Sequence, residues 1–491
     1  MMDARLRWIA PALALGSLAA CEVGPDYVRP TAPTPAAYKE IDGWKPSEPR
    51  EAASGTAWWT IYEDPLLDDL ETQIDISNQT LKASEAAFRQ ASALVQEARS
   101  AFFPTVAVDA SATRSGAGSG RSPAGRSAIT SQFTATGNLS WEIDVWGRIR
   151  RSVEASYASA EASAADLAAA RLSAQSALAA DYLALRISDE LKRLLDATVD
   201  ADTKALQITR NRYNQGTAAR SDVAQAEAQV EGVKAQAINV GVQRAQLEHA
   251  IAVLIGKPPA DFSIAPTPLE LDVPVVPPGV PSTLLERRPD IAAAERSAAS
   301  ANAQIGVAVA AYYPAITLSA SYGFEGSAIE TLFRASNAVW SVGPQLAETV
   351  FDAGLRSAQV AAARAFYDQT IANYRQTVLA AFQQVEDELA ALRILEQQAE
   401  VQDRAVKAAE EAERLILNQY IAGTVAYTNV VTAQTVSLGN KQTALAILQS
   451  RLAASVVLIE ALGGGWTAAD LPSHDQIRES ASPAETAPPS P

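Results

Sequence analysis

Alternating apolar and polar residues mark four short stretches of the chain. The clearest covers residues 133–145, where every second residue is apolar or Gly and those between are Thr, Asn, Ser, Glu or Asp. The same period of two recurs at 106–113 and 316–324, and more weakly at 340–351, which contains Pro344. This period predicts four β-strands with one apolar face. Strands of about 10 residues can cross a bilayer when tilted, although a half-buried soluble sheet would alternate in the same way.

Long helices are predicted for most of the remaining chain. Helical patterns cover 65–102 and 284–311, and a Pro follows each of them. Neither Pro nor Gly occurs in 355–418, and seven apolar residues recur between positions 371 and 392 at a mean spacing of 3.5, the coiled-coil period. Residues 149–212 form a looser counterpart. About 65 helical residues make a rod roughly 100 Å long, which we expect to turn at a Gly and return as a shorter helix.

The order of strands and helices occurs twice. Tyr213 is matched by Tyr420, and Gly216 by Gly423, in each case 207 positions later. Self-similarity at a fixed spacing indicates one architecture built twice within the chain. Two long helical hairpins with Gly at their tips should therefore project from the same side of the sheet.

The N-terminus has the features of an export signal. Arg5 and Arg7 precede an apolar segment rich in Ala and Leu, and Leu-Ala-Ala then leads into Cys21, the one cysteine of the chain. This ending resembles the bacterial lipobox, after which Cys21 would be lipidated and become the mature N-terminus. A plain secretory signal with an incidental cysteine is the alternative. In lipoproteins of this kind, Glu22 in place of Asp indicates no retention in the inner membrane.

The patterns divide the chain into six predicted segments. These are a lipoprotein signal peptide (1–20), a lipid anchor with an irregular segment (21–64), the first repeat (65–256), a Pro-rich linker (257–283), the second repeat (284–463) and a disordered tail (464–491). Four strands cannot close on themselves, and an open sheet edge in hydrocarbon leaves backbone groups unpaired. If the strands span a membrane, several chains must share one barrel.

The composition of the chain counts against nucleic-acid binding and against most kinds of catalytic and metal site. The net charge of -16 counts against nucleic-acid binding, which needs a basic surface. One cysteine and two histidines, His249 and His474, leave no disulfide, no thiolate zinc site and no Cys–His nucleophile. No phosphate-binding loop or dinucleotide fingerprint occurs. We therefore expect no enzyme activity, no metal and no cofactor.

The motifs together resemble the TolC-like outer membrane efflux family, specifically its lipidated OprM/NodT type. They are the run 23–27 after the lipobox, Tyr-x-x-Gly-Thr at 213–217 and at 420–424, and the run 285–291. The resemblance implies a mostly α-helical protein with a membrane β-sheet. Such members form trimers whose shared twelve-stranded β-barrel, four strands per chain, continues as a long periplasmic α-helical coiled-coil barrel. It also implies a periplasmic membrane-fusion (adaptor) protein and an inner-membrane RND-type transporter as partners, and the lipid of the outer membrane.

Two groups of site residues follow from the resemblance. The tips that dock the adaptor correspond to Gly216, Thr217, Gly423 and Thr424, although small exposed turn residues also serve as helix C-caps. The periplasmic gate corresponds to Arg220, Asp222, Tyr420, Asn429 and Thr432. Asp222 and Tyr420 stand where the family places a closing hydrogen bond, whereas relatives carry aspartates where this chain has Asn429 and Thr432. A solvated charge pair is the alternative for Arg220 and Asp222.

The run Arg287-Arg288-Pro289-Asp290 fits the start of a helix better than a substrate contact, because Pro and an acid favour the first turn. The implied function is a passive exit duct for drugs and other toxic small molecules. A duct for secreted protein is the alternative within this class. A non-channel coiled-coil lipoprotein that spans the periplasm is the alternative from another class, and it would need no alternating strands.

Overall fold

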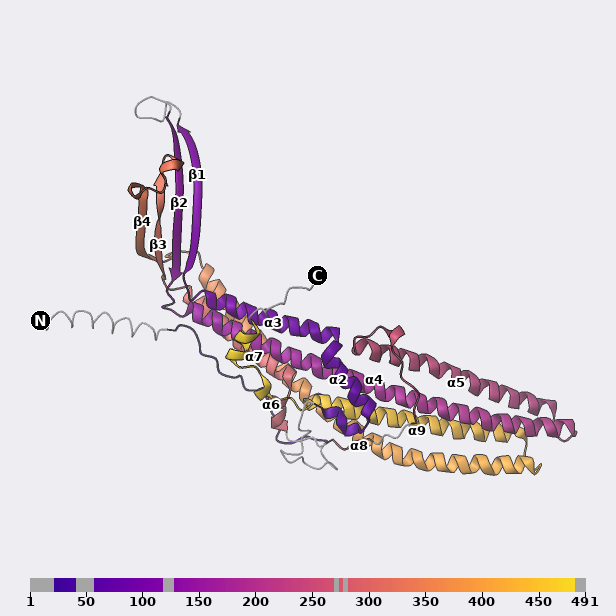
Figure 1. The fold of residues 1–491 in the computed structure, drawn as a ribbon. Helices are drawn as coiled ribbons and strands as arrows, with labels where there is room; N and C mark the ends of the chain where they lie inside the picture. Colours follow the sequence, from indigo (N-terminus) through magenta and orange to yellow (C-terminus); the bar gives the residue numbers. More distant parts are fainter. Residues whose placement is uncertain (1–21, 41–56, 118–127, 269–272, 277–280, 482–491) are drawn as a thin grey trace.

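The computed structural model describes residues 22–40, 57–117, 128–268, 273–276 and 281–481. The molecule is elongated, with a narrow sheet at one end and long helices that extend away from it (Figure 1). The predicted signal peptide and Cys21 lie outside the described residues.

The predicted doubling is confirmed, because two sets of elements follow one another in the same order. The first set is α3 (Gln79–Ser100), β1 (Thr105–Ala117), β2 (Ala128–Glu142), α4 (Arg148–Asn214) and α5 (Arg220–Leu254). The second set is α7 (Pro289–Ala310), β3 (Ala315–Gly326), β4 (Ala338–Ala347), α8 (Leu355–Ile421) and α9 (Tyr427–Ala461). Matching helices have equal lengths, with 67 residues in α4 and α8 and 35 in α5 and α9.

The four predicted strands form one antiparallel sheet in the order β1-β2-β3-β4. The strand β4 was the weakest in the sequence because of Pro344, which lies opposite Leu318. The β3–β4 pairing continues on both sides of Pro344, from Ala315 with Ala347 to Phe324 with Ala338, so one missing backbone N–H does not end the strand. The edges β1 and β4 have no further strand partner among the described residues.

The two long hairpins run side by side away from the sheet (Figure 1). A glycine in the left-handed conformation starts each long helix, Gly147 before α4 and Gly354 before α8, with φ of 81° and 91°. The apolar stripe predicted within 371–392 is confirmed by buried Tyr374, Val378 and Leu389. At a rise of 1.5 Å per residue, each long helix spans roughly 100 Å.

Each of two stretches predicted as one helix consists of two helices. Residues 65–102 form α2 (Pro65–Ser77) and α3, because Asn78 leaves the helix with ψ of 122° and its side chain accepts the α3 cap bond from Leu81. The Asn78 side-chain amide also donates to Leu254 O at 2.7 Å. Residues 284–311 likewise form α6 (Leu284–Arg287) and α7, since the residue before Pro289 is disfavoured in helix.

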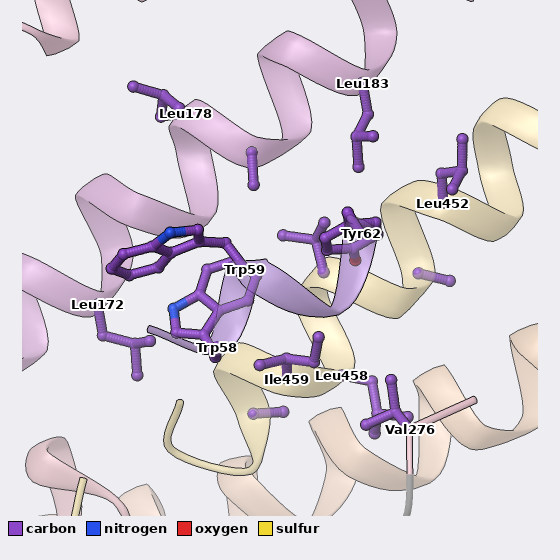
Figure 2. Packing of buried hydrophobic residues seen from close by; sticks show 14 of the residues in the cluster. Trp58, Trp59, Tyr62, Leu172, Leu178, Leu183, Val276, Leu452, Leu458 and Ile459 are labelled. Atoms are coloured by element: carbon purple, nitrogen blue, oxygen red, sulfur yellow. The ribbon is translucent and has the colours of Figure 1, made fainter. Parts of the chain in front are cut away.

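A short 3-10 helix lies within the segment that was predicted to be irregular, so that prediction is wrong for residues 58–62. Trp58, Trp59 and Tyr62 are buried in the main core, against leucines of α4 and the end of α9 (Figure 2). The hydroxyl groups of Tyr62 and Ser455 share a hydrogen bond of 2.7 Å. The core therefore sits halfway along the molecule, where the chain's N-terminal part meets both repeats.

The predicted disordered tail is also wrong for residues 464–481. The chain forms a 3-10 turn at Ala468–Asp470 and the helix α10 (His474–Ser480), with Ser473 as its N-cap. Ile477 is fully buried against Val95 of α3 and Ala160 of α4. The His474 ring also stacks on Tyr157, and the Ser480 hydroxyl donates to Ser92 Oγ at 3.0 Å, so tertiary contacts order a segment of Pro- and Ser-rich composition.

Replacing Ile477 by alanine should detach α10. Removing a buried isoleucine side chain costs about 2–5 kcal/mol, more than a seven-residue helix can supply by itself. Hydrogen exchange of α10 should therefore lose its protection while α4 and α8 keep theirs. The exposed Glu479→Ala serves as the control, and unchanged protection in the isoleucine variant would contradict the docking.

Candidate functional site

The sheet has one apolar and one polar face. The register aligns the apolar side chains in rows across the strands, and these are Val106, Val108, Leu139, Trp141, Ile316, Leu318, Tyr322, Trp340, Val342 and Leu346. The long helices leave both faces uncovered (Figure 1). Most of these side chains are exposed, including Val108 at 82% and Trp340 at 72%. An uncovered apolar face bordered by aromatics is typical of strands that contact lipid.

Aromatic residues gather where the strands meet the helices. The Trp141 indole donates to Phe102 O at 2.9 Å, and the Trp146 indole donates to Pro314 O at 2.9 Å. Trp146 also stacks on Tyr313, with ring centroids 4.9 Å apart. Amphipathic rings of this kind prefer the boundary between hydrocarbon and water, so they mark the level at which the sheet would leave a bilayer.

The polar face carries Thr, Ser, Asn and acidic side chains. Asn138 donates to Asp109 at 2.6 Å across the β1–β2 pair, and Gln132 donates to Glu325 across the β2–β3 pair. Lys and Arg are missing from this face among the described strand residues. This face is therefore polar and acidic.

Both hairpin tips have the same backbone motif. Gly216 and Gly423 adopt φ of 74° and 80°, which favours glycine. Thr217 N donates to Arg212 O at 2.9 Å and Thr424 N to Gln419 O at 3.0 Å, the bonds of a Schellman C-cap. Both threonine side chains accordingly bond back to the same carbonyls instead of pointing to a ligand. The two tips are exposed and have the same set of hydrogen bonds.

The two residues expected to close the gate have different hydrogen-bond partners. Tyr420 is 3% exposed, and its hydroxyl donates to Thr209 Oγ1 at 3.3 Å. The Asp222 carboxylate instead accepts from Ala219 N at 3.4 Å, at the start of α5. Within the described part of one chain, no hydrogen bond joins Asp222 to Tyr420. The expected closing bond is therefore not made inside a chain.

The other gate candidates also have local roles. Arg220 lies 3.8 Å from Glu227, and no ion pair joins it to Asp222 among the described residues. Asn429 and Thr432 are exposed on α9, and the Thr432 hydroxyl donates to Thr428 O at 3.0 Å. Neither carries a charge.

Arg212 is the tip residue that sequence analysis missed. Its guanidinium donates to Tyr420 O and, at 3.2 Å, to Ile421 O, and it lies 4.6 Å from the centre of the Tyr420 ring. It thus caps the C-terminus of α8 from the other hairpin, where cations are favoured. The repeat contained one indication that Arg212 is special. The matching position in the second repeat, 207 residues later, is the neutral Gln419, so the arginine occurs at one tip and not at the other.

A small buried cluster joins the hairpins behind the tips. Tyr420 meets Tyr427 edge to face at 5.1 Å, together with valines of α5 and α9. Further from the tips, Gln434 of α9 donates to Asp202 of α4 at 2.7 Å. Burial raises the pKa of Asp202 to about 6. The two hairpins of one chain are therefore held together by contacts that include buried polar groups.

No three His, Cys, Asp or Glu side chains are grouped as metal ligands in the described ranges. The molecule instead combines a sheet with one lipid-compatible face, an acidic polar face and two long hairpins with matched tips. A model of the outer membrane efflux protein family matches residues 72–257 and 280–464, which correspond to the two structural repeats. The chain belongs to this family.

Relatives of this outer membrane efflux protein cover nearly its whole length. TtgC, a toluene efflux pump outer membrane protein of Pseudomonas putida, is 32% identical over 462 residues, which are 91% of this chain and 93% of TtgC. The pyoverdine export outer membrane protein OpmQ of Pseudomonas aeruginosa is 30% identical over 435 residues, covering 86% of this chain and 91% of OpmQ.

A solved structure confirms the fold. The outer-membrane channel OprN superposes with a TM-score of 0.85 at 28% identity, covering 91% of this chain and 100% of OprN. The predicted TolC-like channel fold and outer membrane location are thus confirmed for this efflux protein. Its strands belong to the outer membrane, and its helices extend into the periplasm.

Proposed function

We propose that three copies of this chain form a passive exit duct within a tripartite efflux pump. The observation that carries the proposal is the open four-stranded sheet, whose edge strands β1 and β4 have no partner in the described chain. Hydrocarbon cannot form hydrogen bonds with the backbone N–H and C=O groups of such edges. These groups would be paired if β1 of one copy paired with β4 of the next. Three copies give a twelve-stranded barrel, and the hairpins below it continue the tunnel.

Energy for transport would come from other proteins. The two tips, Gly216 with Thr217 and Gly423 with Thr424, are proposed to dock a periplasmic adaptor. Both turns are exposed and have the same backbone hydrogen bonds, so one kind of partner segment could contact either of them. An inner-membrane RND-type transporter would supply the driving force through that adaptor. The chain itself would carry out no catalysis.

Lipidation of Cys21 is proposed to anchor each copy in the outer membrane. Acyl chains contribute about 0.8 kcal/mol for each buried CH₂, and two or more chains hold a protein stably. Arg220, Asp222, Tyr420, Asn429 and Thr432 remain proposed gate residues, and an Asp222–Tyr420 contact would have to form between chains or in another state.

The cargo is proposed to be drugs and other toxic small molecules. The relatives named above export toluene and pyoverdine, both small, and this supports small-molecule efflux over protein secretion. A coiled-coil scaffold without a channel would not need a sheet with one apolar and one acidic face.

The native mass of the complex, extracted from outer membranes in mild detergent, tests the proposal. Three chains are expected, each with acyl groups on Cys21, and planar bilayers should show conductance that favours cations, because the polar face carries Asp109 and Glu325. A stable monomer would overturn the shared barrel. A trimer without conductance would instead favour the scaffold.

A further inference from the structure

The N-terminal strap, residues 22–40, follows a long path over the second repeat. It starts beside the β2–α4 junction and ends near the core, where Lys39 N and Glu40 N donate to the Glu386 carboxylate of α8 at 2.7 and 3.0 Å. Between these ends, Arg375 of α8 donates to Thr31 O at 3.1 Å. The strap is fixed along its length, and its upper end contains the run 23–27 noted in the sequence.

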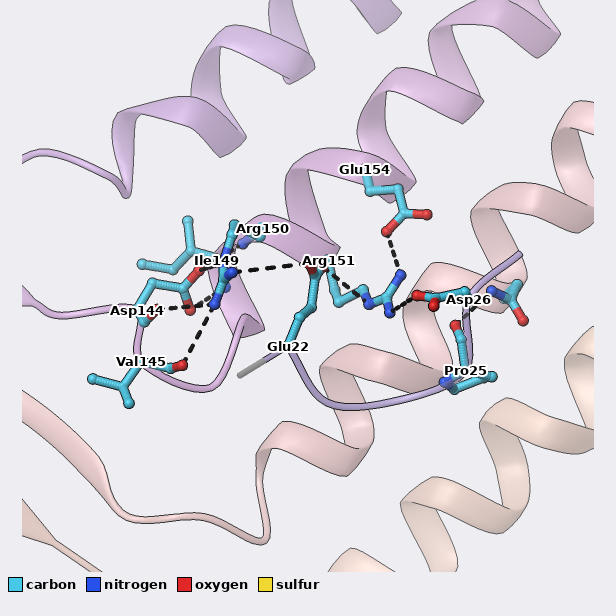
Figure 3. Close-up of polar contacts among 10 residues, drawn as sticks. Glu22, Pro25, Asp26, Asp144, Val145, Ile149, Arg150, Arg151 and Glu154 are labelled. Atoms are coloured by element: carbon cyan, nitrogen blue, oxygen red, sulfur yellow. Dashed lines mark hydrogen bonds and ion pairs between the residues drawn. The ribbon is translucent and has the colours of Figure 1, made fainter. Parts of the chain in front are cut away.

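Arg151 of α4 lies against the end of the strap nearest the sheet, between Glu22 and Asp26 (Figure 3). Its guanidinium is within 3.1 Å of Glu22 and 2.7 Å of Asp26, both from the strap, and within 2.8 Å of Glu154 on α4. The Arg151 side chain is only 4% exposed. The guanidinium is thus buried beneath the strap, whereas the Asp26 carboxylate is 92% exposed, so these ion pairs join the outer side of the strap to α4.

The strap approaches the helices so closely that glycine is required. A Cβ on Gly24, whose φ is 100°, would lie 2.5 Å from Gly306 Cα. A Cβ on Gly306 of α7 would in turn lie 2.7 Å from Arg151 Cγ. Gly24 therefore packs directly on Gly306, and Gly306 packs on the Arg151 side chain. This close packing fixes how the strap is aligned along α7 and α4.

Several further bonds fix this alignment. Val23 N donates to Trp146 O at 3.2 Å, and the Asn302 amide donates to Pro25 O at 3.0 Å. The Tyr27 hydroxyl donates to the Glu295 carboxylate. Glu22 thus lies directly beside the β2–α4 junction, at the level of the stacked Trp146 and Tyr313.

The residue before Glu22 is Cys21, so one peptide unit separates this fixed point from the proposed acyl chains. We infer that Arg151 is a positioning residue, which holds the N-terminus against the base of the sheet and so places the lipid anchor at the level where the strands enter the membrane. This inference rests on the proposed lipidation of Cys21. A short tether gives the strands a high effective concentration at the bilayer. A strap released from Arg151 would lower that effective concentration.

A double-mutant cycle separates anchoring from folding. Arg151→Gln is made in the full chain, and again in a chain with Cys21→Ala that is exported by an ordinary cleaved signal peptide. The readout is the fraction of protein in outer membranes that resists alkaline carbonate extraction. Arg148→Gln is the matched control, since Arg148 lies on the same helix turn but pairs with Glu142 rather than with the strap.

With the acylated chain, Arg151→Gln should lower the resistant fraction about tenfold, the factor that about 1.4 kcal/mol of coupling produces. In the chain without the anchor, the same substitution should have little further effect. An equal loss in both backgrounds would mean that Arg151 serves folding alone and would overturn the inference. Mass analysis of Cys21 is done in parallel, because a chain without acyl groups contradicts the proposed anchor itself.

Discussion

Replacing Glu71 by leucine is expected to stabilise the folded chain by about 3 kcal/mol at pH 7. Glu71 lies on α2, below the membrane, and is fully buried beside Leu67, Leu70 and Ile74. Neither of its carboxylate oxygens has a hydrogen-bond partner in the described structure. Burial, with smaller contributions from Asp75 and Asp68, raises its pKa from 4.5 to about 9.

The sign of the effect follows from the two states of the carboxyl group. The folded chain keeps Glu71 protonated at pH 7, whereas the unfolded chain releases that proton above pH 4.5. The contribution of Glu71 to stability is therefore greatest below pH 4.5, falls as the pH rises, and reaches its lowest value above about 9. Leucine keeps the volume and removes both the titration and the unpaired oxygens.

Thermal unfolding in detergent at pH 5 and pH 8 would measure this effect. At an unfolding entropy near 2.1 cal/mol/K per residue, 3 kcal/mol corresponds to an increase in Tm of about 3 °C at neutral pH. Glu71→Gln should also flatten the pH dependence, whereas Glu97→Gln on the exposed side of α3 should leave it unchanged. A leucine variant that unfolds at a lower temperature would show that the carboxyl has an unrecognised favourable role.

The combined substitution of Arg212→Ala and Tyr420→Phe should loosen the two hairpins of a chain at their tips. The pair removes the cap on α8 and the bond to Thr209 while it keeps the buried ring of residue 420. Hydrogen bonds that involve a charged group contribute about 1.5–3 kcal/mol, enough to raise the population of separated tips about tenfold or more.

Single-channel recording in planar bilayers provides the measurement, with longer open times or larger conductance expected for the double variant. Asp222→Asn is the informative control, because Asp222 contacts Ala219 N and not Tyr420. If Asp222→Asn opened the channel and the Arg212 and Tyr420 changes did not, the closing contact would lie between chains. The contacts described within one chain would then be unrelated to gating.

Local patterns in the sequence determined a large part of this structure. The alternating positions of 133–145 and 316–324 specified the strands and their two faces, because side chains on a strand alternate by geometry alone. The lack of Pro and Gly in 355–418 specified α8, and the repeated Tyr-x-x-Gly-Thr located both tips. The offset of 207 positions predicted one architecture built twice, and the structure has two sets of elements in the same order.

The tertiary structure decided which distant residues meet. Asn78 ends α2 because Leu254 accepts its amide, and Ile477 orders the tail because α3 and α4 provide a place for it. Tyr420 donates to Thr209 rather than to Asp222. Arg151 forms ion pairs with carboxylates of the strap, more than 100 positions away in sequence. Periodicity is a property of neighbours along the chain, so it can specify an element and its faces. Burial and pairing depend on the other elements that surround a residue, and these are fixed only when the whole chain has packed.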